Sequence, residues 1–124
     1  MTSAVIAQTG SAKEPKIVHK PAAMPDFLVA PNGARRTPKD HPLLPVTHDE
    51  IIETAKACQI AGADGIHLHI RDARQAHLLD AAEYQVLLDR IAREVPDLYL
   101  QVTSEAAGRY EAADQIAMLK PLKP

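Results

Sequence analysis

The stretch Ile66-His67-Leu68-His69-Ile70-Arg71-Asp72 decides the fold of this chain. Aliphatic residues alternate in it with two histidines and an arginine, and a period of two is typical of a β-strand. One face of this strand is therefore aliphatic, and the other carries two imidazoles and a guanidinium. The Cα atoms of His67 and His69 would lie about 6.5–7 Å apart. At that spacing both rings can reach one metal ion.

Zinc is the metal that we expect at such a pair. A catalytic zinc ion commonly has three protein ligands and one open position, and two histidines on one strand can supply two of the three. The alternative is a strand whose polar face holds two histidines without any metal. The spacing alone leaves both interpretations open.

The composition excludes several classes of protein. The chain has 124 residues, enough for one domain, and its net charge of −2 comes from 14 basic and 16 acidic residues. This balance gives no reason to expect nucleic acid or a membrane surface as a partner. The single cysteine, Cys58, excludes an intrachain disulfide framework and a cysteine-rich zinc site. No apolar run is long enough for a membrane span and no signal peptide is evident, so we expect a cytoplasmic protein.

Strands and helices alternate along the chain after a tail. Residues 1–25 contain several prolines and no clear period, which predicts a flexible tail, and residues 26–124 are predicted to form the domain. The expected strands begin near Phe27, Gly65 and Leu98. The expected helices lie between Thr47 and Gly62, between Asp80 and Pro96, and from Glu111 to Leu119. This alternation favours a parallel sheet with crossover helices.

Local signals set the details of these elements. Thr47-His48-Asp49-Glu50 is a capping box that begins the first helix, and Asp80 with Glu83 is a second N-cap pair. Phe27-Leu28-Val29-Ala30 is predicted to be a fully buried strand. Ile116 and Leu119 are expected to face inward from the last helix. Residues 73–77 are predicted to be a polar loop. The long loop after Ala30 is either functional or a solvated connector.

Three motifs, in order, resemble the beta-keto acid cleavage enzyme family. They are Ala30-Pro31-Asn32-Gly33-Ala34-Arg35-Arg36, the stretch from His67 to Asp72, and Gln101-Val102-Thr103-Ser104-Glu105. The resemblance runs from about Phe27 to the C-terminus. It implies a zinc-dependent (β/α)8 TIM barrel that cleaves a 3-keto acid with acetyl-CoA, giving acetoacetate and an acyl-CoA.

The resemblance also implies roles for individual residues. His67 and His69 would be zinc ligands, and the Thr103 hydroxyl would contact the substrate and take part in catalysis. Asn32, Arg35 and Glu105 are further substrate-binding candidates, although each of these residue types is also common as a polar lining or turn residue.

Two positions depart from the family pattern. Arg35 stands where the type enzyme carries a glutamate, which we interpret as a changed substrate preference. Glu105-Ala106-Ala107-Gly108 replaces a Gly-rich turn.

Arg71 shares the histidine face, where it could bind a carboxylate or a phosphate of coenzyme A. The other interpretation, which we favour, is a structural ion pair with Asp72 or another acidic group.

The length of the chain bears on its activity. A closed barrel needs about 250 residues, whereas this chain predicts three strand–helix units, an incomplete barrel. The third zinc ligand that the family implies, a glutamate, lies late in the barrel and has no counterpart here. We therefore expect the N-terminal part of such an enzyme, inactive alone and homo-oligomeric at full length. The alternative is an inactive truncated barrel that associates with itself or with a partner.

A metal-dependent amidohydrolase fits the sequence less well, because in that family the histidine pair lies on the first strand.

Overall fold

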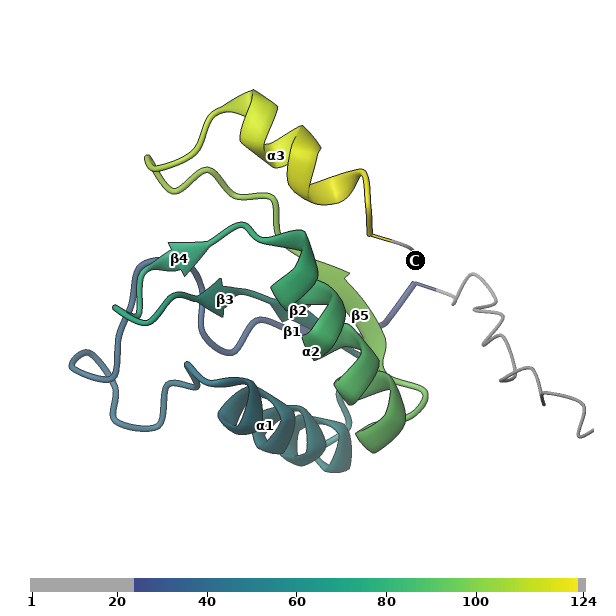
Figure 1. Cartoon of the computed structure of the whole chain (residues 1–124). Coiled ribbons are helices and arrows are strands. Elements are labelled where there is room, and N and C mark those ends of the chain that lie inside the picture. Colours follow the sequence, from purple (N-terminus) through teal and green to yellow (C-terminus); the bar gives the residue numbers. More distant parts are fainter. Residues whose placement is uncertain (1–23, 123–124) are drawn as a thin grey trace, which may run out of the picture.

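The structure, a computed structural model, describes residues 24–122. Nearly all of the predicted tail, residues 1–25, therefore lies outside the described residues. The chain forms mixed α/β structure, with helices and strands that follow one another as Figure 1 shows. The elements are β1 (Leu28–Val29), α1 (His48–Ile60), β2 (Gly65–Leu68), β3 (Ile70–Arg71), β4 (His77–Leu78), α2 (Ala81–Glu94), β5 (Tyr99–Val102) and α3 (Ala112–Leu119).

The main sheet has the order β1-β2-β5, and both of its pairings are parallel. Helix α1 connects β1 to β2, and α2 lies on the connection from β2 to β5. The register places His67 opposite Gln101 and Leu68 opposite Val102. The predicted alternation of parallel strands and crossover helices is therefore confirmed for these three strands.

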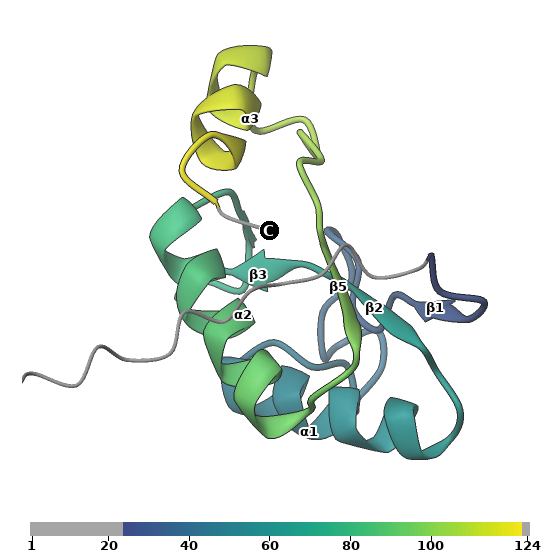
Figure 2. The same ribbon diagram turned by 90° about the vertical axis from the view of Figure 1, so that its right-hand side faces the viewer.

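The hydrophobic core lies between the aliphatic face of the sheet and two helices. Figures 1 and 2 show α1 and α2 side by side along the sheet, with α3 beyond the N-terminal end of α2. The helical spacing of three and four residues explains why each helix buries one stripe. The core residues are Ile51, Ile52 and Ala55 of α1, Tyr84, Leu87 and Ile91 of α2, Ile66 and Leu68 of β2, and Ile70, Val95, Leu98 and Met118.

Side-chain caps begin the first two helices as the sequence predicts. The Thr47 hydroxyl accepts from the amide of Glu50 at 3.2 Å, and the Glu50 carboxylate accepts from the amide of Thr47 at 2.9 Å. At α2, the Asp80 carboxylate accepts from the amide of Glu83 at 2.9 Å. These bonds satisfy amides that have no partner inside the helix. No helix among residues 24–122 is long and apolar enough to cross a membrane.

The central strand is shorter than predicted, because the chain leaves the main sheet at His69. Strand β2 ends at Leu68, and β3 pairs with β4 as an antiparallel hairpin. The prediction of a polar loop over residues 73–77 is therefore wrong for its last residue. Amides of Arg74 and Ala76 donate to the Asp72 carboxylate at 2.9 Å each, and these bonds close the turn between the two short strands.

Two expectations about burial are wrong. Phe27 and Leu28 are 68% and 41% exposed, because β1 lies at the edge of the described sheet and no described element covers its outer side. On α3, Ile116 and Leu119 are 53% and 44% exposed, whereas Met118 is buried. Helical spacing shows which residues share a face, but the packing of α3 beside α2 selects the face around Met118.

Candidate functional site

The two histidines of the central stretch lie together at the end of β2. Their ring centroids are 4.9 Å apart, and the rings meet edge to face. They lie on the opposite side of the strand from Ile66 and Leu68, which face the core. The structure thus brings the two predicted metal ligands to one place, as the alternating pattern predicts.

One nitrogen of His67 is held by the neighbouring strand. Nδ1 of His67 lies 2.6 Å from Oε1 of Gln101, the residue directly opposite it on β5. An amide oxygen can only accept a hydrogen bond, so Nδ1 of the imidazole carries the proton. In the neutral ring, Nε2 then presents a lone pair.

His69 is held through its other ring nitrogen, Nε2, whereas His67 is held through Nδ1. Its side chain is 5% exposed, and Nε2 lies 3.3 Å from Oε2 of Glu105. Burial lowers the pKa of His69 to about 4, although the Glu105 carboxylate opposes this shift. The ring is therefore neutral at pH 7, with its proton on Nε2 toward the carboxylate. Its Nδ1 is buried and has no hydrogen-bond partner among the described residues.

This arrangement of the two rings suits a metal ion. Histidines that bind metals usually donate their other N–H to a carboxylate, a carbonyl or water, which fixes the tautomer. His67 and His69 each have such an acceptor, which leaves Nε2 of His67 and Nδ1 of His69 as the nitrogens not engaged by these contacts. Within residues 24–122, however, no set of three or more His, Cys, Asp or Glu side chains is placed to hold a metal. Among the described residues, His67 and His69 are therefore the two side chains that stay predicted metal ligands.

Asn32 positions the backbone of the site. It is 5% exposed, and its amide Nδ2 donates to the carbonyl of His69 at 2.9 Å and to the carbonyl of Pro45 at 3.2 Å. Asn32 thereby joins the loop after β1 to the point where the chain leaves β2. Its predicted role in binding substrate stays a prediction.

Arg35 and Glu105, two of the predicted substrate residues, form an ion pair. Nη1 of Arg35 lies 2.9 Å from Oε1 of Glu105, and the two side chains are 71% and 34% exposed. Exposed ion pairs add little to stability. The pair instead links the loop after β1 to the carboxylate that contacts the buried His69.

Thr103, which directly follows β5, is also part of the site. It is 6% exposed, its amide donates to the carbonyl of Leu68 at 3.2 Å, and its hydroxyl accepts from the amide of Glu105 at 3.0 Å. Thr103 therefore holds the turn that delivers Glu105 to His69. Its predicted contact with substrate is untested by this geometry.

The favoured prediction, an ion pair of Arg71 with Asp72 or another acidic group, is wrong. The guanidinium of Arg71 donates instead to the backbone carbonyls of Asn32, Gly33, Arg36 and Gln75. Asp72 pairs with Arg109 at 3.0 Å. The planar fork of an arginine can donate in several directions at once, so Arg71 joins the loop after β1 to the β3–β4 hairpin.

His77 belongs to the site and was missed at the level of sequence. It is 4% exposed, its ring centroid lies 5.6 Å from that of His69, and its Nε2 donates to the carbonyl of Glu105 at 2.8 Å. Burial lowers the pKa of His77. The hairpin that carries it has no Asn-Gly or Asp-Gly turn, the strongest short-range signal for a hairpin.

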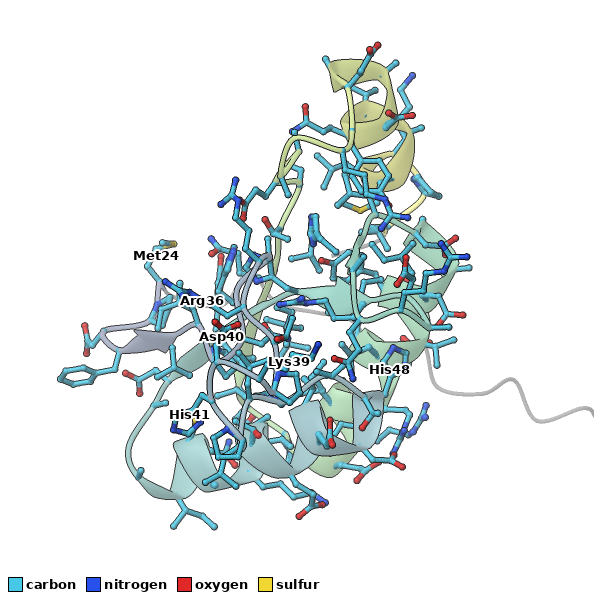
Figure 3. The ribbon with its side chains drawn as sticks, turned by 90° about the vertical axis from the view of Figure 1, so that its left-hand side faces the viewer. Met24, Arg36, Lys39, Asp40, His41 and His48 are labelled. Carbon is cyan, nitrogen blue, oxygen red and sulfur yellow. The ribbon has the colours of Figure 1, made fainter. Side chains whose placement is uncertain are left out.

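In the loop between β1 and α1, several polar side chains bind other residues of the same loop. Figure 3 shows Arg36, Lys39, Asp40 and His41 along this loop. Asp40 accepts from the amide of Thr37 at 2.8 Å and pairs with Arg36 at 3.3 Å. The amide hydrogen bond of Thr37 is the main reason why the pKa of Asp40 lies below its ordinary value. These contacts stabilise the turn over residues 36–41.

A sequence model of the family described as beta-keto acid cleavage enzyme matches residues 28–124. The chain is 35% identical over 96 residues to a 3,5-dioxohexanoate:acetyl-CoA acetone transferase of Paraburkholderia graminis, covering 77% of this chain and 31% of that protein. It is 32% identical over 75 residues to a 3-keto-5-aminohexanoate cleavage enzyme of Acetoanaerobium sticklandii, covering 60% of this chain and 28% of that protein.

A third relative has a different substrate in its name. It is a 3-oxoadipate:acetyl-CoA acetyltransferase of Cupriavidus necator, 28% identical over 96 residues that cover 77% of this chain and 33% of that protein. The chain therefore spans about a third of the length of the curated relatives that it matches. The named substrates of the three relatives are all keto acids.

Proposed function

The chain belongs to the beta-keto acid cleavage enzyme family, and on that basis we propose that it serves a zinc-dependent cleavage of a 3-keto acid with acetyl-CoA. The products would be acetoacetate and an acyl-CoA. The observation that carries the proposal is the pair of imidazoles at the end of β2, each held through one nitrogen by a neighbouring side chain. The chain would supply the first three strand–helix units of a (β/α)8 barrel, whose active sites lie at the carboxyl ends of the strands.

The free nitrogens of the pair would hold the zinc ion. These are Nε2 of His67 and Nδ1 of His69, since their other nitrogens face Gln101 and Glu105. When bound, zinc supplies Lewis-acid chemistry that polarises a carbonyl oxygen. A third protein ligand would have to come from outside residues 24–122.

The remaining residues would orient the rings and the substrate. Glu105 holds His69 in the tautomer that leaves Nδ1 free. Asn32 fixes the carbonyl of the same residue, which limits how far the ring can move. The exposed guanidinium of Arg35 would attract the negative charge of a keto acid. The hydroxyl of Thr103 accepts from the amide of Glu105 and would use its own O–H to contact the substrate.

A competition titration with a chromophoric zinc chelator tests the metal assignment. The double variant His67→Ala/His69→Ala should lose zinc binding, because no other described side chains form a metal site. His41→Ala, in the exposed part of the loop after β1, is the matched control and should bind zinc like the wild type. Unchanged zinc binding by the double variant would reject the assignment.

A second function, association without catalysis, is favoured by a different observation. Phe27, Leu28, Ile116 and Leu119 are exposed apolar side chains, and the outer edges of β1 and β5 are unpaired among the described strands. Such edges and patches favour pairing with another chain. Light scattering after size exclusion would show dimers or larger species if this function holds. A monomer that unfolds cooperatively would count against it.

A further inference from the structure

A pocket of about 400 Å³ lies beside the histidine site. Its walls come from three segments, the loop after β1, the β3–β4 hairpin and the loop after β5. Each of these segments follows the carboxyl end of a strand of the parallel sheet. Among the described residues, no Asp or Glu lines this pocket. The polar residues that line it include Arg35, Arg71, Arg74, Gln75, His77 and Arg109.

The four arginines are only partly compensated by carboxylates. Arg35 pairs with Glu105 and Arg109 pairs with Asp72. Arg71 donates only to backbone carbonyls, which carry no net charge. The structure gives Arg74 no side-chain ion pair with any residue in 24–122. A guanidinium stays protonated in proteins, so the pocket keeps a positive charge.

A buried donor in the pocket also has no acceptor. Nε of Arg71 is buried and lacks a hydrogen-bond partner among the described residues. Buried polar atoms are nearly always hydrogen-bonded. The orphaned N–H of Arg71 therefore indicates a ligand or water that accepts a hydrogen bond at this wall.

We propose that this pocket binds an oxyanion group, a phosphate or a carboxylate, that belongs to one of the reactants. Guanidinium groups match both oxyanions because their planar N–H fork donates two parallel hydrogen bonds. The assignment of the anion to a reactant rests on the proposed function, whereas the anion site itself does not. The two regions are joined, since the ring of His77 lines the pocket and lies 5.6 Å from the ring of His69, and Arg35 pairs with Glu105.

A neighbouring pocket shows why the anion belongs on this side of the hairpin. That pocket, of about 480 Å³, shares Arg74 and Arg109 with the first. It is also lined by Asp72, whose carboxylate accepts from Arg109 and from two hairpin amides. A negative charge in its wall opposes the binding of an anion. The acid-free pocket is thus the one that suits an oxyanion.

Titration of the ¹⁵N-labelled 124-residue chain with two probes tests the proposal. Inorganic phosphate represents the phosphate groups of the thioester cosubstrate, and adipate represents a second carboxylate on the keto acid. Chloride keeps the ionic strength constant in both series, because screening alone weakens charge interactions. We expect saturable shifts of the amides of Gln75, His77 and Ala107 with at least one probe.

Two arginine variants make the titration decisive. Arg74→Gln removes an exposed pocket cation without removing a described side-chain contact, and it should weaken binding at least about threefold. Arg93→Gln removes an exposed cation from α2, outside the pocket lining, and should leave the affinity unchanged. The amide spectrum of each variant shows whether the fold is intact.

The outcomes distinguish phosphate from carboxylate as the source of the anion. They also distinguish the proposed anion site from the proposed zinc site. Tighter binding of phosphate would assign the pocket to the cosubstrate, and tighter binding of adipate would assign it to the keto acid. No saturable binding of either probe, or an equal loss in Arg93→Gln, would overturn the anion site. Anion binding that persists in a chain without zinc affinity would overturn the metal assignment alone.

Discussion

One carboxylate oxygen of Glu105 lies 3.3 Å from Nε2 of the buried His69. The two residues come from different strand ends, since His69 follows β2 and Glu105 follows β5. The contact decides which nitrogen of the ring carries the proton, and it leaves Nδ1 available to a ligand. The metal site that we propose therefore depends on a residue of the neighbouring strand–helix unit.

Replacement of Glu105 tests this dependence. Glu105→Gln keeps the size of the side chain but removes the charge that favours the His69 tautomer, so zinc affinity should fall by about tenfold or more. A chelator competition titration measures the change. Glu53→Gln alters an exposed carboxylate on α1 that pairs with Lys56, and it should leave zinc affinity unchanged. Equal affinities for wild type and Glu105→Gln would show that the contact does not tune the site.

Asn32 should matter more for stability than its place in a loop suggests. Asn32→Ala leaves the buried carbonyl of His69 without its side-chain donor. The loss of a buried hydrogen-bond partner costs about 1–3 kcal/mol of unfolding free energy, which urea denaturation measures. Lys39→Ala, an exposed change in the same loop, should stay within about 0.5 kcal/mol of the wild type. A loss at Asn32 no larger than at Lys39 would contradict a positioning role.

The features that the sequence predicts are those set by residues close together in the chain. The alternation around His67 and His69 predicts which side chains share a face, and the rings do lie together. The Thr47 capping box and the Asp80 cap form as expected, because their partners lie three residues away. Local spacing therefore predicts where the parallel strands lie and where the helices start.

The features that the sequence does not predict depend on distant partners. Arg71 donates to the carbonyls of Asn32 and Gly33, which lie more than 35 residues away in the chain, although Asp72 is its immediate neighbour. The β3–β4 hairpin turns through Gln75 at φ +64°, a conformation that glycine or asparagine usually takes. His77 was missed for this reason, since only the hairpin brings it to His69.

The buried hydroxyl of Tyr84 should contribute a measurable but modest stability. It donates to the carbonyl of Leu68 at 3.2 Å, and the same carbonyl also accepts from the amide of Thr103. Because the carbonyl keeps one partner, Tyr84→Phe should cost about 1 kcal/mol of unfolding free energy. Tyr99→Phe is the control, since the structure gives its hydroxyl no partner in residues 24–122, and it should change stability less. A larger loss in the control would contradict this account.

The capping carboxylate of Glu50 should make stability depend on pH. The amides of Thr47 and then Val46 donate to it, and these bonds lower its pKa in the folded chain. Unfolded Glu50 therefore binds a proton more readily, at its ordinary pKa of about 4.3. Its contribution is fully present above that value and is lost as the pH falls through the folded pKa.

Glu50→Gln isolates this contribution. The variant loses a negative charge at the start of α1 and should be less stable at pH 7 by about 0.3–1 kcal/mol. Below the folded pKa of Glu50 the wild-type side chain is also neutral, so the difference between the two proteins should shrink as the pH falls through that pKa. Urea denaturation at pH 7, 5, 4 and 3 measures both unfolding free energies in matched buffers. Other carboxylates with lowered pKa values, such as Asp72 and Glu94, affect both proteins equally and cancel. A difference that stays constant from pH 7 to pH 3 would show that the charge of Glu50 has no part in stabilising the helix.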